Sequence, residues 1–79
     1  MIVKGRNRAT RIAELLRLAR DEDVSPDRAR SVGAELADHY LRAGKVEDTP
    51  LAEFTADAYL GFDARIAEVQ AKAGRPRRP

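Results

Sequence analysis

The sequence predicts an all-α fold, a small three-helix domain with a long C-terminal helix and a short extended segment at the N-terminus. Apolar residues recur every three or four positions in three separate stretches, which is the spacing of amphipathic helices. Capping residues, prolines and glycines divide these stretches at helical lengths. The 79 residues leave room for one domain, and there is no cysteine for a disulfide or thiolate metal site.

The first helix is expected over about residues 8–22, with a cap at Asn7 or Thr10. Its apolar stripe is Ile12, Leu15, Leu16 and Ala19. Three acids at 21–23 would be unfavourable at the negative end of a helix, so the helix is expected to end there. Residues 1–7 begin with Met-Ile-Val and are the one strand-like candidate in the sequence.

The second helix is expected over residues 26–43. Ser25 is a favourable N-cap, Pro26 suits the first helical position, and Gly44 stands where a C-terminal cap belongs. Gly33 is unfavourable inside a helix unless another helix packs closely against it. The apolar face consists of Ala29, Val32, Leu36 and Tyr40.

The third helix is expected over residues 50–73, capped by Asp48 or Thr49 and with Pro50 in its first turn. Its stripe consists of Leu51, Phe54, Ala58, Phe62, Ile66, Val69 and Ala73. The stripe crosses Gly61 in phase, which predicts one helix of about 24 residues, roughly 36 Å long. The remaining residues, 75–79, form a basic Pro/Arg tail.

A chain of this length builds a small core, and small scaffolds often gain stability by self-association. We therefore expect a homodimer in which the third helix packs on its copy. No apolar run approaches the roughly 20 residues that a membrane span needs. The absence of cysteine fits a reducing compartment, so we expect a cytoplasmic protein without a cofactor.

The charge distribution is the strongest functional signal. Residues 1–20 hold six basic side chains and one acidic one, residues 21–74 hold twelve acidic and six basic, and the last five hold three arginines. Basic segments of this kind neutralise phosphates. The expected nucleic-acid-binding residues are Lys4, Arg6, Arg8, Arg11, Arg75, Arg77 and Arg78. Solubility, or attraction between the ends and middle of two copies, explains the same pattern equally well.

Residues 1–44 are expected in the order strand, helix, turn, helix. This order resembles the ribbon-helix-helix arrangement of DNA-binding proteins, with Lys4 and Arg6 on the face that would read bases and Ser25 at the start of the second helix. The sequence departs from that arrangement in three ways. Gly5 interrupts the strand, the turn lacks the usual glycine, and the second helix is longer.

A DNA-associated regulator is therefore the first hypothesis. The alternative is a protein-binding inhibitor or adaptor, of the antitoxin or phage- and plasmid-encoded anti-defence kind, acting through the third helix. Its expected contact residues are Phe54, Tyr59, Leu60 and Phe62. Tyr59 and Leu60 are the better candidates because they fall outside the apolar stripe.

Catalytic and metal-binding patterns are weak, and we expect no enzymatic activity. His39 and Glu35 have the spacing of an ordinary pair on a helix surface, and a metal site needs three or four ligands. Ser25 is explained by capping, and Ser31 has no glycine elbow around it. The acidic group lacks the ligand spacing of a calcium loop and is read as a solvated turn. It comprises Asp21, Glu22, Asp23 and Asp27.

Overall fold

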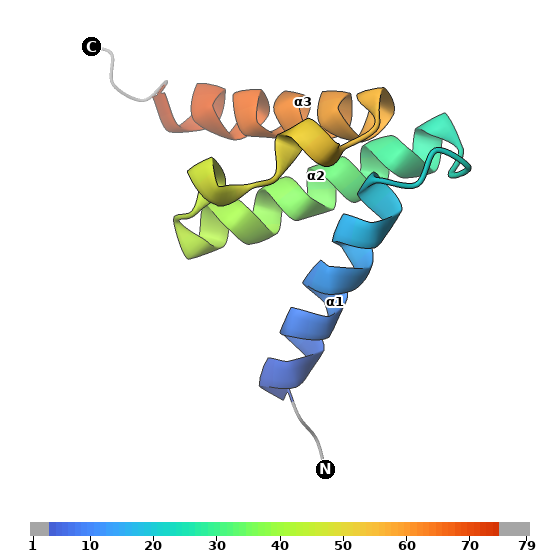
Figure 1. Ribbon diagram of the computed structural model, residues 1–79. Coiled ribbons are helices and arrows are strands. Elements are labelled where there is room, and N and C mark those ends of the chain that lie inside the picture. Colours follow the sequence, from blue (N-terminus) through green and yellow to red (C-terminus); the bar gives the residue numbers. More distant parts are fainter. Residues whose placement is uncertain (1–3, 75–79) are drawn as a thin grey trace.

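A computed structural model of the chain describes the backbone of residues 4–74 and the side chains of residues 9–72. It contains three α-helices, α1 (Lys4–Ala19), α2 (Pro26–Ala43) and α3 (Ala56–Gly74), as Figure 1 shows. Two 3₁₀ turns, η1 (Val46–Asp48) and η2 (Leu51–Glu53), lie between α2 and α3. The described part of the chain has no strand, so the prediction of a small all-α domain is confirmed.

The expected start of the first helix is wrong. α1 begins at Lys4, so the last four residues of the expected extended segment 1–7 are helical, and residues 1–3 lie outside the described part. A strand needs partner strands for its backbone hydrogen bonds, and the described residues offer none. Arginine, alanine and leucine dominate the rest of α1 and favour a helix, which continues back through residues 4–7. The strand of a ribbon-helix-helix arrangement is therefore absent over residues 4–7.

The expected ends of the second helix are confirmed. Pro26 is its first residue, and the Ser25 Oγ accepts a hydrogen bond of 3.3 Å from the Arg28 N–H. Gly44 has a φ of 70°, in the left-handed region where glycine is favoured, and its N–H donates to the Leu41 carbonyl at 3.1 Å. Local capping chemistry therefore fixes α2 at both ends.

The third helix begins six residues later than expected. Residues 50–55 belong to the connection that contains η2, and the cap of α3 is Thr55, whose Oγ1 accepts a hydrogen bond of 3.3 Å from the Ala58 N–H. A 3₁₀ turn also repeats every three residues, so the spacing of Leu51 and Phe54 suits either structure. From its true start α3 continues through Gly61 without a break, as expected.

The helices α2 and α3 run in the same direction (Figure 1). The ion pairs between them show this, since Arg30 near the start of α2 lies 3.3 Å from Asp57 and Asp38 farther along lies 2.7 Å from Arg65. The connection 44–55 therefore travels back along the pair before α3 begins. Its partly buried apolar side chains, Val46, Leu51 and Phe54, pack against the core.

Two glycines allow α2 and α3 to approach closely. A Cβ on Gly33 would collide with the backbone carbonyl of Ala58, and a Cβ on Gly61 would collide with that of Arg30. Each glycine therefore faces the backbone of the other helix. The close helix packing that makes a glycine at position 33 tolerable is therefore present.

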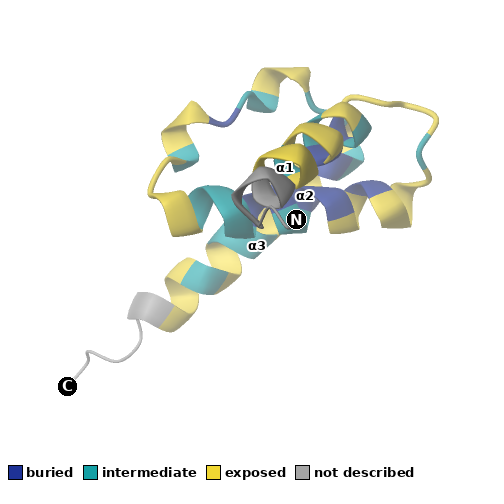
Figure 2. Cartoon of the chain, turned by 90° about the horizontal axis from the view of Figure 1, so that it is seen from below, coloured by how far each residue is buried: buried dark blue, intermediate teal, exposed yellow. Residues whose placement is uncertain are grey.

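The core lies mainly between α2 and α3, and the described side chains of α1 add two buried residues to it (Figure 2). The buried apolar residues are Leu15, Ala19, Ala29, Val32, Leu36, Ala37, Ala58 and Phe62. The C-terminal end of α1 is tied to the start of α3, because the Thr55 N–H donates to the Ala19 carbonyl at 2.8 Å. No helix within the described residues is long and apolar enough to cross a membrane.

Candidate nucleic-acid interface

The first two turns of α1 carry the basic residues expected to bind nucleic acid. Among the described side chains of α1 the first fully buried one is Leu15, so residues 4–11 precede the core. Figure 1 shows this part of the helix extending away from α2 and α3. Helical spacing puts positions 4, 8 and 11 on one face and position 6 on another. The basic segment is thus helical from residue 4, whereas the sequence suggested an extended segment as far as residue 7.

Arg11 is occupied by carboxylates. Its Nε and Nη2 each donate to a Glu35 carboxylate oxygen at 2.9 Å, and its Nη1 lies 3.3 Å from Glu14. The hydrogen bonds from Arg11 hold the pKa of Glu35 below its ordinary value of 4.5, and the same contacts raise the pKa of Arg11. Arg11 therefore joins α1 to α2, and these contacts leave its guanidinium less free to meet a phosphate.

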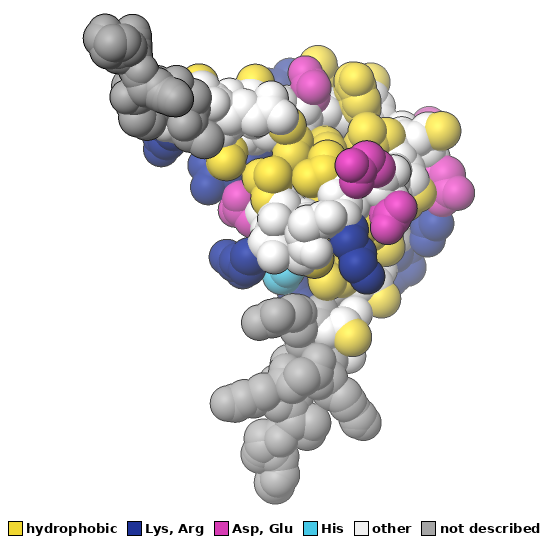
Figure 3. Space-filling view, turned by 90° about the vertical axis from the view of Figure 1, so that its left-hand side faces the viewer, with side chains coloured by type: hydrophobic (Ala, Val, Ile, Leu, Met, Phe, Trp, Pro, Cys, Tyr) yellow, Lys and Arg dark blue, Asp and Glu magenta, His cyan; other side chains and the backbone are white. Residues whose placement is uncertain are grey.

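Arg42, which sequence reasoning did not select, lies beside the basic part of α1. Arg42 and His39 on α2 line a small hollow with Ile12 on α1, with a volume of about 120 Å³. Figure 3 views this side of the molecule, with basic side chains around the histidine. A basic residue in the last turn of a helix ordinarily complements the helix dipole. Only the packing of α1 on α2 shows that Arg42 lies near Ile12, the residue that follows the basic segment in the sequence.

His39 forms the ordinary helix pair expected from its spacing. Its Nε2 lies 3.8 Å from a Glu35 oxygen, and its side chain is mostly buried. The described residues contain no group of three or more His, Asp or Glu side chains arranged to hold a metal. In the acidic turn, Asp21 Oδ1 accepts a hydrogen bond of 2.9 Å from the Asp23 N–H, which gives that carboxylate a role in the turn itself.

The four residues expected to contact a protein partner fall into two groups. Phe62 is 2% exposed and belongs to the core, and Phe54 packs against it edge to face with the ring centroids 6.0 Å apart. Tyr59 is 44% exposed and Leu60 is 51% exposed. Of the four residues, Tyr59 and Leu60 are therefore the ones exposed enough to contact a partner. The tail arginines, Arg75, Arg77 and Arg78, lie outside the described residues.

Known proteins give no indication of what this chain does. The chain matches no protein-family model, no curated protein and no solved structure. Function therefore has to be inferred from the residues of this chain and their arrangement.

Proposed function

We propose that this chain is a non-enzymatic DNA-binding regulator whose interface is the N-terminal half of α1 together with the C-terminal end of α2. The contact residues would be Lys4, Arg6 and Arg8, with Arg42 beside them. The observation that supports this most is the basic segment on a helix that extends past the core (Figure 1). Arg17 is exposed and makes no ion pair within the described residues, and helical spacing puts it on the same face of α1 as position 6.

A helix is a suitable shape for this purpose. The major groove of B-DNA is about 12 Å wide and admits an α-helix. Residues 4–11 would span about 12 Å at 1.5 Å per residue, enough to cross the groove between phosphates. Lysine and arginine side chains on such a helix neutralise phosphates and release counterions, which makes the affinity fall steeply with salt.

Arg11 has a different part in this proposal from the one expected from the sequence. Its paired hydrogen bonds to Glu35 cross from α1 to α2 and add to the core contacts that set the angle between the two helices. The basic turns would therefore meet DNA in one orientation relative to Arg42. In this proposal Arg11 positions α1, and Lys4, Arg6 and Arg8 contact the phosphates.

The test is fluorescence anisotropy with labelled mixed-sequence duplex DNA at low and physiological salt. The triple variant Lys4→Gln, Arg6→Gln, Arg8→Gln should bind at least about tenfold more weakly, and its salt slope should fall by about three. The matched control removes the same charge elsewhere, at Arg20, Arg28 and Lys72, and should bind nearly as the wild type. A wild type that ignores the duplex at low salt would refute the proposal, as would equal losses in the two triple variants.

The second candidate is a protein-binding inhibitor or adaptor that acts through the outer face of α3. Its support is the exposure of Tyr59, because tyrosine is enriched at the centres of protein interfaces. If the chain ignores nucleic acid, immobilised wild type and Tyr59→Ala should be compared for the proteins they retain. Equal retention by the two would remove this candidate.

A further inference from the structure

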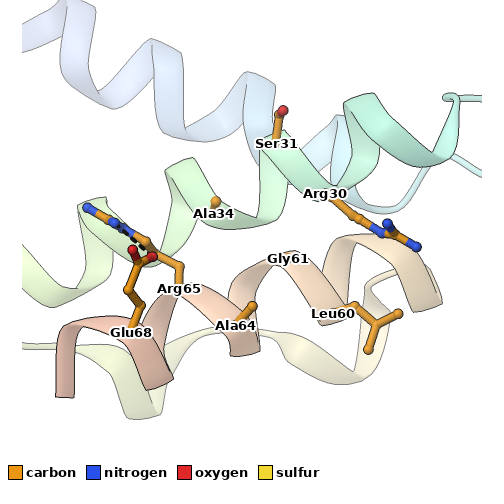
Figure 4. A pocket seen from close by; sticks show the side chains of 8 residues that line it. All are labelled: Arg30, Ser31, Ala34, Leu60, Gly61, Ala64, Arg65 and Glu68. Atoms are coloured by element: carbon orange, nitrogen blue, oxygen red, sulfur yellow. Dashed lines mark hydrogen bonds and ion pairs between the residues drawn. The ribbon is translucent and has the colours of Figure 1, made fainter. Parts of the chain in front are cut away.

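A shallow apolar groove lies between α2 and α3 (Figure 4). Its volume is about 530 Å³, and Ala34, Gly61 and Ala64 form its small-residue floor. Leu60, one of the exposed large apolar side chains, stands at its edge. Arg30 lies toward one end of the groove, and no residue of α1 or of the connection 44–55 lines it. The other end carries Arg65 with Glu68.

The groove follows from the glycine contacts between the two helices. Gly33 and Gly61 bring the α2 and α3 backbones together, and the alanines beside them are too small to fill the space above the contact. An apolar surface of this kind is stabilised when a partner removes it from water. Leu60 is 51% exposed and would gain from the same burial.

We propose that the groove is the interface of a homodimer, in which Leu60 of each copy fills the groove of the other. The protruding leucine and the groove lie side by side on one face. A two-fold axis through that face would seat each leucine over Ala34, Gly61 and Ala64 of the second copy. Such an interface is self-complementary, as two-fold interfaces have to be.

The charges at the ends of the groove suit a second copy of this chain better than a partner that is uniformly acidic or uniformly basic. Arg30 lies 3.3 Å from Asp57 at one end, and Arg65 lies 3.1 Å from Glu68 at the other. Both ends therefore carry an arginine and a carboxylate. With α3 antiparallel to its copy, Arg30 would meet the carboxylate of the opposite end, Glu68 of the second copy, and the same contact would occur twice. Opposite charges that meet in this way fix the register of an interface.

The core of the single chain gives a reason for association. Only three large side chains, Leu15, Leu36 and Phe62, are fully buried within the described residues, and four of the other buried apolar residues are alanines. A chain of this length gains stability when two copies cover each other's apolar surface. The N-terminal half of α1 lies outside the proposed interface, so the dimer and the DNA-binding proposal can fail separately.

Analytical ultracentrifugation of the full chain over a wide concentration range tests the dimer. The wild type should reach the mass of two chains, and Leu60→Lys should weaken association at least about tenfold, because it would bury an ammonium in an apolar groove. Tyr59→Lys is the matched control, since Tyr59 is exposed on the same helix and does not line the groove. It should associate as the wild type does, and circular dichroism should show helical spectra for both variants.

Three results would overturn the proposal. If the wild type stays monomeric, the groove is not a homodimer interface. A Leu60→Lys variant that associates normally would place the interface elsewhere. Equal weakening by Leu60→Lys and Tyr59→Lys would indicate a contact over the outer face of α3 and away from the groove.

Charge reversal tests the register of the two copies. Arg30→Glu and Glu68→Arg should each associate more weakly alone, because each homodimer would then bring like charges together twice. An equimolar mixture of the two should recover wild-type association, since both cross-contacts again join opposite charges. A mixture no better than its components would refute the antiparallel arrangement.

Discussion

The α2–α3 pair and α1 are held in different ways. Two glycines bring α2 and α3 into backbone contact, and the ion pairs Arg30–Asp57 and Arg65–Asp38 follow the pair along its length. By contrast, the buried side chains among the described residues of α1 lie in its second half, and most of its basic residues lie in its first. Stability is thus concentrated in one region, and the proposed binding surface in another. Substitutions in the two regions should therefore have separable effects.

Hydrogen exchange should show the largest difference between the regions. The amides of residues 8–11 bond to the first turn of α1, far from buried side chains, whereas those of residues 32–37 lie in the core of α2. Local opening costs little outside a core and approaches the full stability inside it, which is about 4–12 kcal/mol for a chain of this length. We expect protection to differ at least about a thousandfold by mass spectrometry of peptides. Equal protection would show that α1 is held along its whole length.

Removal of the Phe62 ring, at the centre of the core, should have the next largest effect on stability. Phe62→Ala empties a buried site in the α2–α3 pair and should cost about 3–5 kcal/mol, enough to unfold much of the protein. Tyr59→Ala, on the exposed side of the same helix, should stay within about 0.5 kcal/mol of the wild type. Urea denaturation followed by circular dichroism measures both. A Phe62→Ala variant as stable as the wild type would show that the Phe62 ring is not needed for the core.

The glycine contact should give a smaller but specific effect. In Gly61→Ala the new methyl group meets the backbone of Arg30, which cannot rotate away, so we expect a loss of about 2–3 kcal/mol despite the higher helix propensity of alanine. Gly44→Ala meets nothing within 4 Å but has a φ of 70°, and should cost about 1 kcal/mol. Thermal unfolding should rank the two in this order. The reverse order would show that α2 and α3 can separate at little cost.

The contact between α1 and α2 should have the smallest effect, and it should depend on pH. Because Arg11 holds the pKa of Glu35 below its ordinary value of 4.5, this contact stabilises the fold fully above that value and is lost as pH falls through the lower folded-state pKa. Wild type and Glu35→Gln should therefore differ at neutral pH and converge in acid.

Melting temperatures across an acidic pH series measure this difference. Glu47→Gln, which removes an exposed carboxylate outside the contact, is the control and should follow the wild type throughout. A constant difference between wild type and Glu35→Gln at all pH values would refute the ionic origin of the contact.

The features that could be predicted from the sequence have local causes. Ser25, Pro26 and Gly44 act within a turn of themselves, so both ends of α2 were predictable. The apolar stripes likewise identified three of the buried residues of α2, Ala29, Val32 and Leu36, and the continuity of α3 through Gly61. Where two structures share a spacing, as the 3₁₀ turns and α3 do before residue 56, the pattern could not separate them.

The features that could not be predicted depend on distant parts of the chain. The commitment of Arg11 to Glu35 and the position of Arg42 beside α1 both require the packing angle of α1 on α2. The groove beside Leu60 requires the parallel arrangement of α2 and α3. Single-sequence periodicity carries no information on either, because it reports which face of a helix is apolar and leaves open which helix covers that face.

The parallel arrangement of α2 and α3 also bears on how fast the chain folds. Two antiparallel helices can meet first at their turn and then close along their length, but here even the contacts at the starts of the helices, such as Arg30 with Asp57, join residues far apart in sequence. The connection 44–55 must close before any part of the pair can form. Lengthening it should therefore slow folding while changing stability little, since each doubling of a loop costs only about 0.6 kcal/mol. The rate-limiting event of this helical protein would then resemble the long-range closure usual in sheet proteins.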